Sequence, residues 1–170
     1  MKTIEIKLYH FSELSEESKQ NAVKSLRQQC YEANAEWTWE DASGTTDFVE
    51  EVADVWCDIQ SSSQGFYCRS CHNKSEDYDL SYKEEFEQFR ADYLEQFKEN
   101  LWCDSTMKEI VENWEFNENE SYASNIADII IAFCRIIDDE TLSYYEDDNV
   151  VEWIETQDFD FTEDGRVYHG

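Results

Sequence analysis

Residues 28–68 carry nine acidic side chains and no lysine or arginine. Folded domains usually intersperse charges of both signs on their surfaces, because like charges that lie close together repel each other. A chain that folds with such a segment must spread these carboxylates apart or balance their repulsion in another way. The nine acids are Glu32, Glu36, Glu40, Asp41, Asp47, Glu50, Glu51, Asp54 and Asp58.

The charge excess extends over most of the chain. With 41 acids and 13 bases the formal net charge is −28, although residues 1–27 hold five bases and only four acids. Duplex DNA has one negative charge per about 1.7 Å of its axis, so this charge corresponds to about 48 Å of duplex. A compact chain of this length is about 40 Å across. The protein therefore has a charge density comparable to that of DNA.

The composition predicts a folded protein. Hydrophobic residues make up 41% of the 170 residues and aromatic residues 15%, whereas acidic disordered chains are poor in aromatics. The length favours one domain over residues 1–170. No apolar run reaches the roughly 18 residues of a membrane span, and residues 1–9 lack the apolar core of a signal peptide.

We therefore expect the protein in the cytoplasm of the cell that makes it, away from membranes. Thiols are kept reduced in that compartment, so all six cysteines are expected to be reduced. These are Cys30, Cys57, Cys68, Cys71, Cys103 and Cys134.

Hydrophobic periodicity predicts the elements of the first half of the chain. The patterns indicate a strand over residues 3–9, a helix over 15–32, an irregular link over 36–40, a break at Ser43 and Gly44, a helix over 47–59, a loop over 61–65 and a short strand over 66–68.

The second half of the chain is predicted to be mainly helical. The patterns indicate helices over residues 82–101 and 106–114, a break at 117–120, and a helix over 122–137 that is ended by Asp138, Asp139 and Glu140. A short helix around 150–154 and a hairpin over 159–168 follow, and the hairpin turns at Asp164 and Gly165. Together these elements predict an α+β fold, a mostly helical single domain with a small antiparallel sheet formed by the N-terminal strand and the C-terminal hairpin.

Both ends of the chain carry motifs of a known family. Residues 9–22 read Tyr-His-Phe-Ser-Glu-Leu-Ser-Glu-Glu-Ser-Lys-Gln-Asn-Ala, and residues 159–166 read Phe-Asp-Phe-Thr-Glu-Asp-Gly-Arg. These segments resemble small acidic phage and prophage proteins that are often described as antitoxins of toxin–antitoxin stability systems. The glycine-rich middle segment of that family is reduced here to Ser-Ser-Gln-Gly-Phe at residues 62–66, without the Asp-Gly that follows. The resemblance implies a phage origin and supplies no catalytic residues.

The run Cys68-Arg69-Ser70-Cys71-His72 has the spacing of several known sites. It matches the pattern for covalent haem attachment, but that chemistry requires export, for which the chain has no signal. A zinc site needs four ligands; Cys68, Cys71 and His72 are weak candidates, with Cys57 or Cys103 to complete the set. A redox pair and plain reduced thiols are the alternatives, and we expect no cofactor.

Enzymatic motifs are missing from the sequence. His10, His72 and His169 lie in no recognisable triad, and neither a phosphate-binding loop nor an H-E-x-x-H motif occurs. Direct binding to nucleic acid is disfavoured because the net charge has the wrong sign. We therefore expect no catalysis and no direct nucleic-acid contact.

The charge density and the phage resemblance together favour mimicry of DNA. Nucleic-acid-binding proteins recognise rows of phosphates through Lys and Arg, and rows of carboxylates can occupy the same groove. The predicted partner is a basic nucleic-acid-binding protein or ribonucleoprotein of a host CRISPR or restriction system. Three rows are candidates for this contact: Asp47, Glu50, Glu51, Asp54 and Asp58; Glu84, Glu87, Glu95 and Glu99; and Glu146, Asp147, Asp148, Glu152 and Glu155.

Other functions fit the same composition. An antitoxin-like protein would neutralise a basic toxin through a conventional interface with apolar hot spots. A small zinc-binding module is a further alternative, and an acidic surface can also serve solubility alone. The sequence leaves open whether the chain forms a homodimer.

Overall fold

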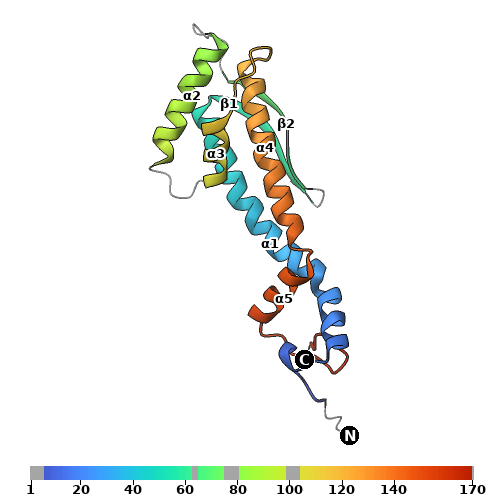
Figure 1. Cartoon of the computed structure of the whole chain (residues 1–170). Coiled ribbons are helices and arrows are strands. Elements are labelled where there is room, and N and C mark those ends of the chain that lie inside the picture. Colours follow the sequence, from blue (N-terminus) through green and yellow to red (C-terminus); the bar gives the residue numbers. More distant parts are fainter. Residues whose placement is uncertain (1–5, 63–64, 75–80, 99–103, 170) are drawn as a thin grey trace. The chain divides into compact units, whose positions relative to one another are not determined.

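The computed structural model describes residues 6–62, 65–74, 81–98 and 104–169 (Figure 1). The chain divides into two compact units, and each is treated by itself below. The first unit comprises Met1–Glu36 and Glu140–Gly170, and the second comprises Trp37–Asp139. The single domain over residues 1–170 that the sequence indicates stays a prediction. In the described part of the chain, no helix is both long enough and apolar enough to cross a membrane.

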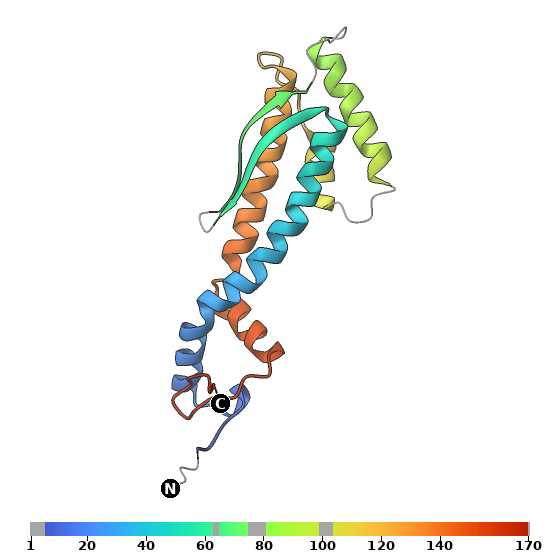
Figure 2. The same cartoon turned by 180° about the vertical axis from the view of Figure 1, so that it is seen from behind.

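The second unit is built around an isoleucine-rich helix, α4 (Tyr122–Ser143). Its buried side chains recur with the helical period, which is the pattern of a helix that packs into a core. They include Ile126, Ile129, Ile130, Phe133 and Ile137. These side chains pack in one hydrophobic cluster with residues of α1 (Glu16–Val52), α2 (Tyr82–Phe97), α3 (Ser105–Asn113) and the strands β1 (Val55–Ser62) and β2 (Gly65–Asn73). Figures 1 and 2 show the hairpin of β1 and β2 lying along α4.

Helix α1 is continuous over 37 residues, so the predicted irregular link at 36–40 and the predicted break at Ser43 and Gly44 are wrong. A glycine in a helix interior costs about 1 kcal/mol relative to alanine. Burial of Phe48 and Val49 on the same helix offsets that cost, because full burial of a valine or phenylalanine side chain contributes about 1.5–3 kcal/mol.

The predicted helix over 47–59 is also wrong beyond Val52. Asp54 has a positive φ of 51°, a conformation that Asp tolerates better than most residues, and this turn ends α1. The chain then continues as β1, where buried Val55 and Cys57 flank exposed Trp56. Apolar residues at 52, 55, 56 and 59 fit a helical period, whereas Val55, Cys57 and Ile59 fit the alternation of a strand, which explains the error. Asp54 and Asp58 therefore do not lie on the helix predicted for them.

Strands β1 and β2 pair antiparallel and form the sheet. The predicted strand at 66–68 lies within β2 and is confirmed. The predicted loop over 61–65 is corrected, since residues 61, 62 and 65 belong to the strands, while residues 63–64 lie outside the described residues.

The remaining helices follow the predictions closely. Helices α2, α3 and α5 (Asp147–Thr156) lie where periodicity indicates them, although residues 99–101 of the predicted 82–101 helix lie outside the described part. Helix α4 does not end at Asp138, Asp139 and Glu140 but continues to Ser143. Burial of Thr141 on its inner face outweighs the unfavourable charges near its C-terminus, which cost only about 0.3–1 kcal/mol each.

The first unit has its own small core. Phe11 of the short 3₁₀ helix η1 (Phe11–Glu13), Leu26 of α1, Ile154 of α5 and Phe161 pack together with their neighbours. The predicted N-terminal strand is wrong over residues 6–8, and only isolated bridges from Phe161 to Tyr9 and Val167 remain of the predicted sheet. The α+β class with a small antiparallel sheet is confirmed, but the sheet is the β1–β2 hairpin.

Gly165 provides a test of the first unit. It has φ +84°, and a Cβ there would lie 2.0 Å from the Ser18 carbonyl oxygen. We expect Gly165→Ala to lower the free energy of unfolding by about 2 kcal/mol or more. Gly44→Ala in α1 is the matched control and should raise it by about 1 kcal/mol. Urea titrations measure both, and a Gly165→Ala variant as stable as the wild type would contradict this description of the turn.

Candidate functional site

An acidic surface on α1 of the second unit, which we call the α1 acidic face, has no ion pair with a described residue. It consists of Glu40, Asp47 and Glu51, which lie at positions i, i+7 and i+11 of α1 and therefore on one side of the helix. All three side chains are exposed. None of them forms an ion pair with a residue in the described part of the chain.

The other members of the first predicted row lie elsewhere. The Glu50 carboxylate is half-buried and hydrogen-bonded by the Cys57 backbone; its pKa is raised, mainly by burial and further by Asp47. Asp54 is exposed in the turn after α1. Asp58 is half-buried in β1 and accepts a hydrogen bond of 3.3 Å from the Gln60 side chain. Of the first predicted row, only Asp47 and Glu51 therefore lie on the α1 acidic face, together with Glu40, which the prediction did not include.

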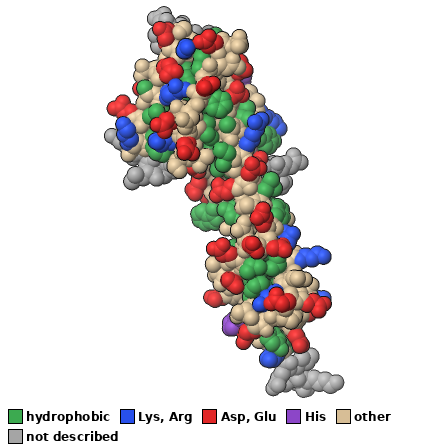
Figure 3. Space-filling view, viewed as in Figure 1, with side chains coloured by type: hydrophobic (Ala, Val, Ile, Leu, Met, Phe, Trp, Pro, Cys, Tyr) green, Lys and Arg blue, Asp and Glu red, His purple; other side chains and the backbone are tan. Residues whose placement is uncertain are grey.

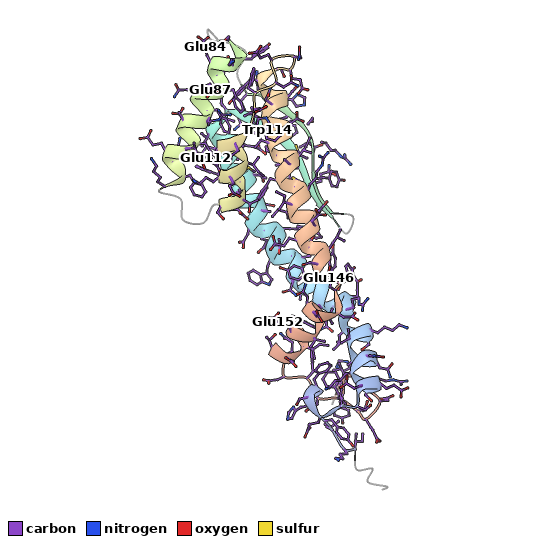
Figure 4. All side chains as sticks on the ribbon, viewed as in Figure 1. Glu84, Glu87, Glu112, Trp114, Glu146 and Glu152 are labelled. Carbon is purple, nitrogen blue, oxygen red and sulfur yellow. A yellow bond between two sulfur atoms is a disulfide. The ribbon has the colours of Figure 1, made fainter. Side chains whose placement is uncertain are left out.

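The second predicted row lies on α2, where the charges have partners. Glu84 closes a capping box with Ser81, whose hydrogen bonds lower the pKa of the Glu84 carboxyl. Glu87 pairs with Arg90 at 3.2 Å. Glu95 is exposed, and Glu99 lies outside the described residues. Figure 4 shows Glu84 and Glu87 on α2, with Glu112 on the neighbouring α3.

Two further bases are paired around α2 and α3. Lys83 lies 3.0 Å from Glu118, and Lys108 lies 3.3 Å from Glu112. Arg90 also donates to the main-chain oxygens of Val111 and Trp114, and so satisfies carbonyls at the end of α3. Figure 3 shows acidic and basic side chains interspersed on this part of the second unit. The α2–α3 surface is therefore less suited than the α1 acidic face to present uncompensated charge.

The third predicted row lies in the first unit, on α5. Glu146 is the N-cap residue, and Asp147 and Asp148 lie in the first turn, where negative charge is favoured by the helix dipole. Asp147 also pairs with Arg27 of α1. Glu152 and Glu155 are exposed farther along the helix, and Figure 4 shows Glu146 at the start of α5 and Glu152 on it. The start of this row thus has a role in stabilising α5.

An exposed tryptophan lies beside the α1 acidic face. The Trp37 side chain is 72% exposed, and it lies three and four residues before Glu40 and Asp41 on the same helix. Residues at these spacings are neighbours on a helix surface. Trp39 instead packs against the core. The sequence pattern does not reveal this arrangement, because it predicts an irregular link over residues 36–40.

The cysteines come together at the hairpin. Cys57 and Cys71 form a disulfide, so the expectation that all six are reduced is wrong for this pair. Cys68 lies beside them, with its sulfur 3.8 Å from that of Cys71. Burial raises the pKa of Cys68 to about 11, so its thiol is protonated at neutral pH. His72 is exposed and stacks on Trp56, and Cys103 lies outside the described residues.

A buried carboxylate lines a hollow of about 190 Å³ in the second unit. Glu85 of α2 is only 6% exposed, and neither of its carboxylate oxygens has a hydrogen-bond partner among the described residues. Gln88, Asp92 and Tyr122 line the same hollow. Burial raises the pKa of the Glu85 carboxyl, because loss of hydration disfavours its charged form.

Comparisons of this chain with protein-family models, curated proteins and solved structures give no match. The resemblance to small phage and prophage proteins therefore stays a prediction.

Glu85 predicts a specific pH dependence. Because its folded-state pKa is raised, the folded chain binds this proton more tightly than the unfolded chain, and stability falls as pH rises through the folded pKa. Glu85→Gln should therefore match the wild type near pH 4 and exceed its free energy of unfolding by about 1–3 kcal/mol at neutral pH. Glu95→Gln, exposed on the same helix, is the control and should show no such difference. Equal stability of Glu85→Gln and wild type at both pH values would contradict the prediction.

Proposed function

We propose that this protein is a phage-derived mimic of DNA that occupies the nucleic-acid-binding groove of a host defence complex of the CRISPR or restriction type. The observation that carries the proposal is the α1 acidic face, whose three carboxylates have no cationic partner within the described chain. Around α2 and α3, by contrast, Lys83, Arg90 and Lys108 each pair with an acid.

The spacing of the carboxylates supports the proposal. Glu40 and Asp47 are separated by about 10 Å along the axis of α1, and Asp47 and Glu51 by about 6 Å, at 1.5 Å per residue. Phosphates of one DNA strand advance about 3.4 Å along the duplex axis, so these separations correspond to about three and about two phosphate steps. A groove lined with Lys and Arg that tracks one strand would therefore meet carboxylates at comparable intervals.

The surrounding charge favours fast association with such a groove. By sequence, the second unit contains 25 acids and seven bases. A field of one sign steers an oppositely charged partner and raises the association rate at low salt. Contacts of this kind release counterions, so affinity should fall steeply as salt concentration increases.

Charge reversal of the α1 acidic face tests the proposal. We expect wild-type protein to displace a labelled DNA duplex from a CRISPR effector complex or a restriction enzyme, with affinity about ten-fold or more weaker at 200 than at 50 mM NaCl. The triple variant Glu40→Lys, Asp47→Lys and Glu51→Lys should lose the displacement, since it places three cations against a cationic groove. Fluorescence anisotropy measures the displacement.

The matched control reverses three other exposed acids of the same unit, Glu95, Glu109 and Glu115. It changes the net charge by the same amount, so it separates position from total charge. Displacement that survives reversal of the α1 acidic face, or that both triple variants lose equally, would contradict the assignment of this face.

A second candidate function is neutralisation of a basic toxin through a conventional interface. The exposed Trp37 and Trp56 favour it, because tryptophans are enriched among residues that dominate binding energy. In that case Trp37→Ala should weaken binding about 30-fold or more, equivalent to about 2 kcal/mol, with little dependence on salt. Under mimicry the same variant should leave the steep salt dependence in place. Calorimetric titration of the purified partner at two salt concentrations distinguishes the two functions.

A further inference from the structure

Three cysteines of the β1–β2 hairpin lie close enough to share one ion. The sulfur atoms of Cys57, Cys68 and Cys71 all lie within 4.8 Å of one another. Cys57 and Cys68 are buried and Cys71 is half-buried. Such a cluster of sulfur atoms in an apolar core is a soft donor set that suits zinc.

A β-bulge creates this cluster. Residues three apart on a regular strand face opposite sides, so Cys68 and Cys71 would normally diverge. Here Cys57 pairs with Cys71 and Ile59 pairs with Cys68, which leaves one extra residue on β2 between the two pairs. The extra residue brings both cysteines to the same face of the hairpin. Because of the bulge, the two cysteines of the C-x-x-C motif lie on one face of the hairpin, where both sulfur atoms can bind the same ion.

A fourth thiol comes from a different element. Cys134 of α4 is buried, and its thiol is hydrogen-bonded to the backbone of Cys68. Cys134 is not among the zinc ligands that the sequence suggests, because no local spacing connects residue 134 with residues 57–71. His72, which the sequence suggests as a ligand, is instead exposed. It stacks on Trp56, its cross-strand partner on β1.

The spacing of Cys68 and Cys71 suits tetrahedral coordination by sulfur. Zinc–sulfur bonds of about 2.3 Å place the sulfur atoms of a tetrahedral site about 3.8 Å apart. The sulfur atoms of Cys68 and Cys71 are 3.8 Å apart. The sulfur atoms of Cys57 and Cys71 are bonded to each other, so the disulfide must open before both can bind an ion.

We propose that the reduced chain binds one zinc ion through Cys57, Cys68 and Cys71, with Cys134 as the fourth ligand, and that the Cys57–Cys71 disulfide is the oxidised, metal-free form of the same site. A dithiol reductant would supply the two electrons and two protons that convert the disulfide into two thiols. Binding of the ion to four thiols then releases four protons to solvent.

The two forms differ in what they connect. The disulfide joins β1 to β2 only, whereas a metal ion held also by Cys134 would join the hairpin to α4. A two-stranded hairpin is marginally stable by itself, so a link to α4 would stabilise its attachment to the core. This inference concerns structure and does not depend on the proposed mimicry.

The test uses the full-length protein, reduced and freed of metal, with cobalt(II) as a spectroscopic probe and zinc as its competitor. We expect one cobalt ion per chain, with the visible bands of tetrahedral coordination and a thiolate charge-transfer band, both abolished by zinc. Zinc should also raise the melting temperature, because an ion that binds only the folded chain stabilises it.

Cys68→Ser separates metal binding from disulfide formation, because it removes a ligand and keeps Cys57 and Cys71. We expect Cys68→Ser to weaken cobalt binding at least ten-fold. The oxidised variant should still form the Cys57–Cys71 disulfide, which mass spectrometry detects and which indicates that the hairpin is folded. Cys30→Ser, which removes a buried thiol of the first unit, is the matched control and should bind as the wild type does. Wild-type protein with all thiols reduced but without a thiolate–cobalt band would overturn the proposal, as would binding that Cys68→Ser leaves unchanged.

Discussion

Repulsion among carboxylates that the chain does not neutralise is the constraint on which this structure depends. Like charges at helical spacing destabilise a helix by a few tenths of a kcal/mol per pair, and α1 carries its exposed acids without a base from Gln28 to its end. The fold withstands this because α1 is anchored by Phe48 and Val49, which are buried in the same hydrophobic cluster as the isoleucines of α4. Hydrophobic burial at about 25 cal/mol per Å² is large enough to offset several repulsive pairs.

The few bases are placed where they support the packing of particular elements. Arg90 joins the end of α3 to α2 and also pairs with Glu87, and Arg27 joins α1 to the start of α5 through Asp147. Isolated exposed ion pairs contribute little stability, but they remove charge locally. The α1 acidic face, on which the proposed function rests, has no such pair with a described residue.

The sequence was most informative where hydrophobic periodicity was long and unambiguous. The isoleucines of α4, the aromatic residues of α2 and the short helices α3 and α5 were predicted near their observed positions. Prediction failed where tertiary burial overrode local preference, as at Gly44, and where one apolar pattern fitted two periods, as after Val52. The cysteine cluster could be predicted only in part, because the bulge between Cys68 and Cys71 and the approach of Cys134 depend on long-range packing.

The most direct measurement of the central claim is the salt dependence of the free energy of unfolding. Urea titrations would compare the wild type with the neutralised variant Glu40→Gln, Asp47→Asn and Glu51→Gln, at about 20 and about 500 mM NaCl, where the Debye length falls from about 20 to about 4 Å. If the α1 acidic face concentrates the repulsion, salt should stabilise the wild type more than the variant, by a few tenths of a kcal/mol or more. Equal gains in the two proteins, or no gain in the wild type, would contradict the account.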